Sequence, residues 1–121
     1  GSHDDRQVLY DTDTGKITGQ LGRPGDFPKP GGDIALSPDG MRFVNGYSNK
    51  DPGENFYAIL FRNKNRLLRT RAFSRGELVS GALRIDPAPR WNRTGDKILV
   101  SAIADDAQRT RQLFVIELSD Q

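Results

Sequence analysis

The sequence predicts an all-β fold, and three features of its 121 residues favour this prediction. Thirteen glycines and seven prolines divide the chain into short segments, as expected for many turns between strands. Within those segments apolar and polar residues alternate with a period of two, which is typical of half-buried strands. No segment has the i, i+3, i+4 apolar spacing of an amphipathic helix. We therefore expect antiparallel strands joined by turns.

The composition excludes several kinds of functional site. The single histidine, His3, belongs to Gly1–His3, which we interpret as the remnant of a cleaved tag, and the chain has no cysteine. Thiolate nucleophiles, histidine general bases and His/Cys metal sites are therefore absent. The net charge of +2 is too small to indicate a nucleic-acid partner. No apolar run approaches the ~20 residues of a membrane span, so we predict no membrane partner. Because usable histidines and cysteines are missing, we also predict no metal and no cofactor.

One strand-turn-strand unit organises the chain and recurs once. Asp33–Tyr47 (DIALSPDGMRFVNGY) contains two strands around a Ser-Pro-Asp-Gly turn, and Ala88–Ile103 is a looser copy. The turn glycines, Gly40 and Gly95, are 55 residues apart (95 minus 40). Self-similarity at such a period predicts a repeat architecture.

The strands follow in order along the chain. Period-two alternation and turn residues predict strands at 7–11, 16–21, 33–37, 41–47, 55–62, 67–73, 89–92, 97–104 and 112–118. Asn55–Arg62 and Gln112–Leu118 are apolar on both faces, and a strand of that kind must be covered on both sides. We expect Trp91 and Phe43 to pack in the core between units. The expected units are an outer hairpin with a loop (4–32), a complete four-stranded unit with a loop (33–87) and three strands of a further unit (88–121).

The turns resemble those of WD-like and TolB-like β-propellers. Three segments show this resemblance: Ser37-Pro38-Asp39-Gly40 after a short strand, the looser copy Pro89–Asp96, and the hairpin turn Asp11–Lys16. Leu36 departs from the pattern, since the repeat prefers tryptophan there. The resemblance implies antiparallel four-stranded blades in a partial propeller, a C-terminal fragment of about two and a quarter blades. It also implies a periplasmic or secreted protein. The implied partners are the remaining blades or a second copy, through open strand edges.

The lengths of the connections predict where a ligand binds. The longer connections (22–32, 48–54, 74–87 and 104–110) all emerge at the same end of the strands, where binding loops tend to collect. Mixed acids and guanidinium groups there suit an acidic carbohydrate or a peptide. The candidate ligand-binding residues are Lys50, Asp51, Glu54, Arg75, Arg84, Asp86, Arg90, Asp105 and Arg109. The alternative is that these charges are only solvated.

Two functions from different classes remain open at this point. The first is a non-catalytic segment that acts as a scaffold and binding surface for protein or carbohydrate. The second is a part of a propeller enzyme, an oligogalacturonate-lyase-like lyase or hydrolase, with its catalytic residues outside this chain. We assign no catalytic residue. An ordinary β-sandwich with a coincidental repeat is the alternative fold.

Overall fold

The computed structural model describes residues 2–3, 6–23, 26–27, 32–50, 52–75, 85–104 and 110–119. Eleven strands and one 3-10 turn make up the regular structure of these residues, which confirms the all-β prediction. Within these ranges, no helix is long and apolar enough to cross a membrane.

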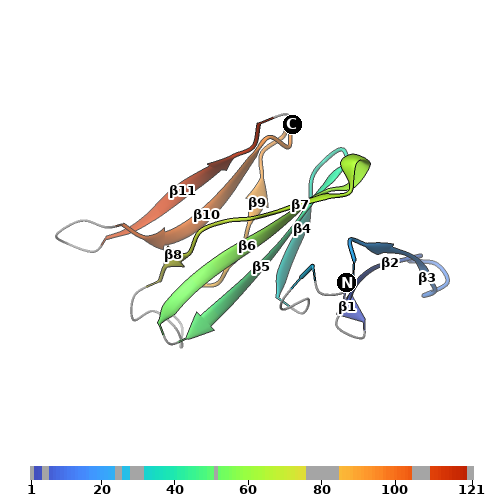
Figure 1. Ribbon diagram of the computed structural model, residues 1–121, viewed down its shortest axis with the longest axis horizontal. Helices are drawn as coiled ribbons and strands as arrows, with labels where there is room; N and C mark the ends of the chain where they lie inside the picture. The colour runs from blue at the N-terminus through green and yellow to red at the C-terminus, as the bar shows by residue number, and fades with distance from the viewer. Residues whose placement is uncertain are drawn as a thin grey trace.

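The strands form three antiparallel sheets (Figure 1). The N-terminal sheet contains β1 (Ser2–His3), β2 (Arg6–Tyr10) and β3 (Ile17–Leu21). The central sheet contains β4 (Asp33–Leu36), β5 (Arg42–Lys50), β6 (Gly53–Phe61), β7 (Arg66–Arg69) and β8 (Phe73–Ser74). The C-terminal sheet contains β9 (Arg90–Trp91), β10 (Lys97–Ile103) and β11 (Arg111–Glu117). The 3-10 turn η1 (Arg62–Lys64) joins β6 to β7.

The first hydrophobic core lies between the central and C-terminal sheets. Tyr57 and Ile59 of β6 are fully buried and belong to one cluster with Ile98, Val100 and Ala102 of β10. Half-buried side chains of β11 and the half-buried Trp91 pack against the same cluster. Trp91 therefore lies between two sheets, as the sequence predicted.

The second core lies between the central and N-terminal sheets. Ala58 and Leu60 of β6 point away from the first core and pack with Leu21 of β3 and with Phe27 and Phe43. The rings of Phe27 and Phe43 meet edge to face, with centroids 5.4 Å apart. Strand β6 is thus covered on both sides, which confirms the prediction for Asn55–Arg62. The same prediction for Gln112–Leu118 is wrong in the described structure, because Leu113 and Val115 on one face of that segment are 64% and 51% exposed.

The turn between β4 and β5 is held by its own polar groups. The Gly40 N–H donates to the Ser37 carbonyl at 2.9 Å, and the Ser37 N–H donates to the Arg42 carbonyl at 2.8 Å. The Arg42 N–H donates to Ser37 Oγ at 2.9 Å. Gly40 has φ +74°, a conformation that glycine adopts at least cost.

The turn between β9 and β10 repeats this pattern with different residues. The Gly95 N–H donates to the Asn92 carbonyl at 3.2 Å, and the Asn92 N–H donates to the Lys97 carbonyl at 3.0 Å. The Lys97 N–H donates to Asn92 Oδ1 at 3.0 Å, and Gly95 has φ +72°. An asparagine amide oxygen here does what the serine hydroxyl does in the first turn. The repeat therefore survives although the Ser-Pro-Asp triplet is lost.

The repeat extends across three strands of the central sheet and three strands of the C-terminal sheet. In the central sheet Val44 of β5 pairs with Ile59 of β6, and in the C-terminal sheet Leu99 of β10 pairs with Val115 of β11. Residues of β4 and β5 thus have counterparts 55 positions later in β9 and β10, and those of β6 have counterparts 56 positions later in β11. The unit β4-β5-β6 corresponds to β9-β10-β11, residue by residue.

Contacts between the first strands and turns tie the two units together. The Trp91 indole N–H donates to the Ala35 carbonyl of β4 at 3.0 Å. Arg42 Nη1 donates to the Gly95 carbonyl at 2.7 Å. A Cβ built on Gly95 would lie 3.3 Å from the Cβ of Ser37. The two turns therefore lie side by side.

Three expectations about strand boundaries differ from the structure. The predicted loop at 48–54 belongs almost entirely to β5 and β6, because β8 pairs with Glu54 and Asn55 and holds the start of β6 from its other side. The predicted strand at 67–73 is divided into β7 and β8, with Thr70 bonded to Tyr57 at the break. Ser2–His3, assigned above to a tag remnant outside the fold, pairs with Arg6 and Gln7.

Candidate functional site

The nine candidate ligand-binding residues do not form one site in the described structure. Asp51, Arg84, Asp105 and Arg109 lie outside the described residues, and for Lys50 only the backbone is described. The remaining four are Glu54, Arg75, Asp86 and Arg90. Two of these, Asp86 and Arg90, line the same groove, while Glu54 lines a different one.

Arg75 is a buried side chain that organises the backbone. Only 3% of its surface is exposed. Its Nη1 donates to the Ile85 carbonyl and its Nη2 to the Asn49 carbonyl, each at 3.3 Å. The Asn55 side-chain amide also donates to the Ile85 carbonyl, at 3.2 Å. Arg75 therefore holds the segment entering the C-terminal sheet against the central sheet, and we assign it a structural role.

The groove that contains Asp86 and Arg90 lies on the outer face of the C-terminal sheet. It has a volume of about 440 Å³. Its floor includes Leu99, Ser101 and Leu113, and the charged groups among its described lining residues are Asp86, Arg90 and Arg111. All three charged residues are exposed. Two guanidinium groups and one carboxylate over an apolar floor can hold an anionic group that carries an apolar portion.

Arg111 was not among the sequence candidates. The expected loop ends at residue 110 and the expected strand begins at residue 112, whereas in the structure Arg111 opens β11 and lines the groove. The repeat could have identified Arg111 as a candidate, because Arg111 is the counterpart of Asn55 and lies at the corresponding position of the sheet. Asn55 contacts the segment that crosses the central sheet.

The second groove lies between the central and C-terminal sheets. Its volume is about 340 Å³, and its lining includes Glu54, Arg71, Phe73 and Phe114. The Arg71 guanidinium lies over the Phe73 ring, 4.6 Å from its centroid. Because the Arg71 guanidinium packs on this ring, it is less available to a ligand. Glu54 is the other charged residue among the described residues that line the groove.

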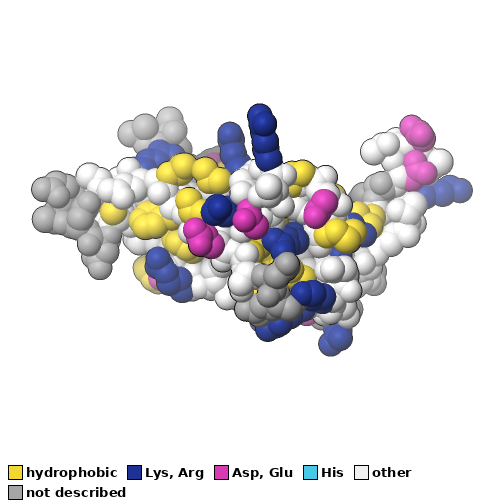
Figure 2. Space-filling view, turned by 90° about the horizontal axis from the view of Figure 1, so that it is seen from above, with side chains coloured by type: hydrophobic (Ala, Val, Ile, Leu, Met, Phe, Trp, Pro, Cys, Tyr) yellow, Lys and Arg dark blue, Asp and Glu magenta, His cyan; other side chains and the backbone are white. Residues whose placement is uncertain are grey.

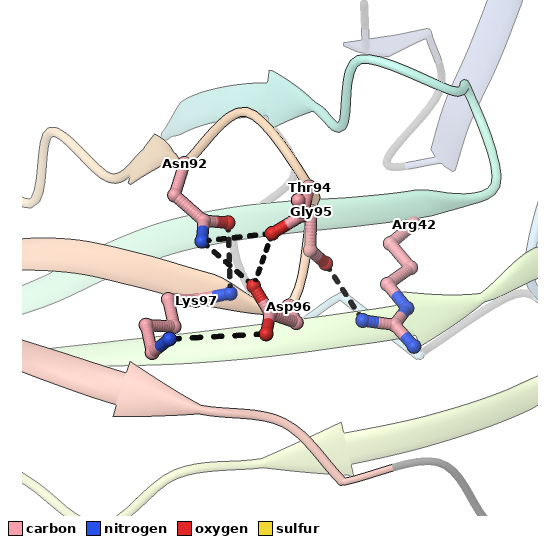
Figure 3. Close-up of polar contacts among 6 residues, drawn as sticks. All are labelled: Arg42, Asn92, Thr94, Gly95, Asp96 and Lys97. Atoms are coloured by element: carbon pink, nitrogen blue, oxygen red, sulfur yellow. Dashed lines mark hydrogen bonds and ion pairs between the residues drawn. The ribbon is translucent and has the colours of Figure 1, made fainter.

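The carboxylates of the two turns have lowered pKa values because each accepts hydrogen bonds within its turn. Asp96 accepts hydrogen bonds from Thr94 Oγ1 at 2.6 Å and Asn92 Nδ2 at 2.7 Å (Figure 3). These bonds lower the pKa of Asp96 to about 2. In the first turn the Met41 N–H and the Ser37 hydroxyl lower the pKa of Asp39. Both groups stay ionised near neutral pH, so neither suits the role of a general acid.

Tyr57 is a buried titratable residue of the first core. Burial raises the pKa of its hydroxyl, and the charge of Asp33 raises it further. The hydroxyl oxygen is buried without a hydrogen-bond partner. A phenol that stays neutral and lies below the surface cannot reach a substrate, so Tyr57 belongs to the core.

The Asp11–Gly15 segment forms a hairpin turn. Asp11 Oδ1 accepts the Asp13 N–H at 2.8 Å and the Thr14 N–H at 3.3 Å, as an Asx-turn does. Among the described residues, no group of three histidine, cysteine or acidic side chains is arranged to hold a metal ion.

No protein-family model, curated protein or solved structure matches this chain. The function is therefore inferred from the geometry of the sheets and of the groove.

Proposed function

We propose that this chain is a non-catalytic segment of a β-propeller that acts as a scaffold and a binding surface for another protein. The support is the order of its sheets. Consecutive β-meanders along the chain pack face to face, the central one between the other two (Figure 1). The central sheet has the strand order β4-β5-β6-β7, as one four-stranded blade has.

The outer face of the C-terminal sheet is the observation that carries the proposal. On β11 Leu113 is 64% exposed and Val115 is 51% exposed. Their counterparts on β6, Tyr57 and Ile59, are 0% and 1% exposed, because the C-terminal sheet covers them. Hydrophobic side chains gather over the end of the molecule that contains β11 (Figure 2). An apolar face built like a covered one suits a further sheet.

The edge of β11 supports the same proposal. The Tyr57 N–H and carbonyl of β6 bond to Thr70, on the side away from β5. Along an antiparallel strand, the backbone N–H and carbonyl of successive residues point alternately to the two neighbouring strands. Leu113, the counterpart of Tyr57, therefore directs its N–H and carbonyl away from β10, and so does Val115. No described strand pairs with that edge. A free edge of this kind can accept a strand from a second copy or from a neighbouring blade.

Light scattering across a range of protein concentrations tests the proposal. We expect the wild-type mass to rise with concentration as copies associate through this face and edge. Val115→Glu places a charge in the apolar face and should leave a monomer. Met41→Glu, at an exposed residue of the first turn, is the matched control and should associate as the wild type does.

A wild-type protein that stays monomeric at every concentration, or a Val115→Glu variant that associates unchanged, would contradict the proposal. An assay on acidic oligosaccharides with and without divalent metal is a second test. Metal-dependent turnover would contradict the scaffold proposal and would favour the alternative that the chain is part of a propeller enzyme.

A further inference from the structure

The Ile85–Pro87 segment packs on one face of the central sheet, and the part of this face beneath the segment is called the bed. The Ile85 carbonyl accepts hydrogen bonds from Asn55 and Arg75, and Ile85 is fully buried. The next proline, Pro87, lies directly over Gly46 of β5. A Cβ on Gly46 would collide with the Pro87 carbonyl oxygen and lie 3.0 Å from its Cβ. The Ile85-Asp86-Pro87 segment therefore packs on Gly46 and Asn55, and the Tyr57 ring lies next to Gly46.

The C-terminal sheet contains the counterpart of this bed. Gly46 pairs with Tyr57 in the central sheet, as Ser101 pairs with Leu113 in the C-terminal sheet. Ser101 and Leu113, together with Arg111, line the groove of about 440 Å³ described above. The groove thus lies where, one repeat earlier, the Ile85–Pro87 segment lies.

The charges of the groove differ from those of the occupied bed. Arg111 stands where the central sheet has Asn55, and Arg90 stands where it has Ala35. Two positions that are neutral in the bed are therefore cationic in the groove, and among the described lining residues Asp86 supplies the carboxylate. This change favours an occupant that carries an acidic side chain.

The floor of the groove also differs at one position. Ser101 has a Cβ where Gly46 has none, so an occupant cannot approach this strand as closely as Pro87 approaches Gly46. The Ser101 hydroxyl can donate a hydrogen bond to a carbonyl of the occupant instead.

We propose that this groove binds an extended peptide segment of the aliphatic–acidic–proline type, at the place that corresponds to the position of Ile85-Asp86-Pro87 on the central sheet. The aliphatic side chain packs on Leu99 and Leu113, and the carboxylate faces Arg90 and Arg111. The proline keeps the segment extended without a backbone donor that would need a partner. The inference rests on the proposed function, because it gives the chemistry of the protein that the outer face would bind.

The probe is the chain's own sequence from Ile85 to Pro89, a labelled, amidated Ile-Asp-Pro-Ala-Pro peptide. Fluorescence anisotropy should detect saturable binding to the full chain. Arg111→Glu should weaken binding at least about tenfold, since it replaces attraction of the peptide carboxylate by repulsion. A peptide with asparagine in place of aspartate should lose a similar factor. Arg66→Glu reverses an exposed arginine on β7, away from the groove, and should bind as the wild type does.

Ser101→Leu is a second variant, which fills the groove and should abolish binding. Its fold is checked by circular dichroism and thermal unfolding. The peptide could also displace its own segment from the central sheet, and in that case Arg111→Glu and Ser101→Leu would bind it unchanged. That result would overturn the inference.

Absence of saturable binding to wild type at millimolar protein would also overturn it, as would binding of trigalacturonate in the groove without binding of the peptide. A wild-type protein that binds the peptide but stays monomeric would contradict the association of copies proposed above and would support the peptide site. Failure of this inference and failure of the proposed function are therefore distinguishable.

Discussion

At the scale of single residues, the polar groups of the second turn replace those of the first by different chemistry. Asn92 supplies through its amide oxygen the bond that Ser37 supplies through its hydroxyl. The acidic residue also has a different position in the two turns, since Asp39 precedes the turn glycine and Asp96 follows it. The geometry is kept because each turn needs an acceptor for the N–H that opens the next strand, and several side chains can provide one.

Asp96 gives a prediction on pH dependence. Its pKa of about 2 in the folded state lies below the ordinary value of 3.8, so the carboxylate form favours folding. Its contribution to stability is present above about pH 4 and is lost as the pH falls through 2. Thr94→Val removes one donor and should raise the pKa of Asp96 in an NMR titration. The pKa of Asp39, in the other turn, should not change, and an unchanged Asp96 would contradict the assignment.

Tyr57 gives a prediction on stability. Its hydroxyl is buried without a partner, and the desolvation of such a group opposes folding. Tyr57→Phe should raise the free energy of unfolding by about 1 kcal/mol, measured by urea denaturation. Tyr47→Phe is the control, since Tyr47 is half-buried and stacks on Phe56. A loss of stability in Tyr57→Phe would mean that the hydroxyl has a partner, such as a water molecule.

At the scale of elements, the sheets are built from a strand-turn-strand unit whose turn needs a glycine with positive φ. Both turns have one, at Gly40 and Gly95, and both glycines are recognisable in the sequence. The strand ends are less recognisable. Ser48–Lys50 and Gly53–Glu54 are polar and look like a loop, yet pairing of β6 with β8 extends the hairpin. Polar sequence alone does not end a strand that has neighbours to bond.

The two turn glycines differ in the space around them. A Cβ on Gly40 would meet no atom within 4 Å, whereas on Gly95 it would lie 3.3 Å from Ser37 Cβ. Gly40→Ala should cost about 1–2 kcal/mol of stability, from positive φ alone. Gly95→Ala should cost more, because the neighbouring turn must also move. Equal losses in urea unfolding would mean that the two turns do not press on each other.

At the scale of the whole molecule, the three sheets form a stack with a covered centre and an uncovered end. Strand β6 is enclosed by two hydrophobic cores and by strands on both edges. Strand β11, its counterpart, has one packed face and one described neighbour. The same backbone unit thus occurs in two environments within one chain.

Hydrogen exchange should distinguish these environments. The amide of Ile59 faces β7, and its counterpart Val115 faces the uncovered edge, so Val115 should exchange at least about 100-fold faster in dilute protein. Raising the protein concentration should slow Val115 selectively if copies associate there. Protection of Val115 equal to that of Ile59 in a monomer would mean that the edge is already covered.

The sequence by itself determined the all-β class, the recurrence of the strand-turn-strand unit, most of the strands and the two-sided burial of β6. Turn glycines and period-two alternation are local signals, so they can be recognised without a fold. The tertiary structure alone decided that Arg75 is buried and that Arg111 joins Asp86 and Arg90 at one groove. Exposed and buried arginines look alike in sequence. What separates them is which sheet packs over which strand, and that depends on contacts between residues far apart in the chain.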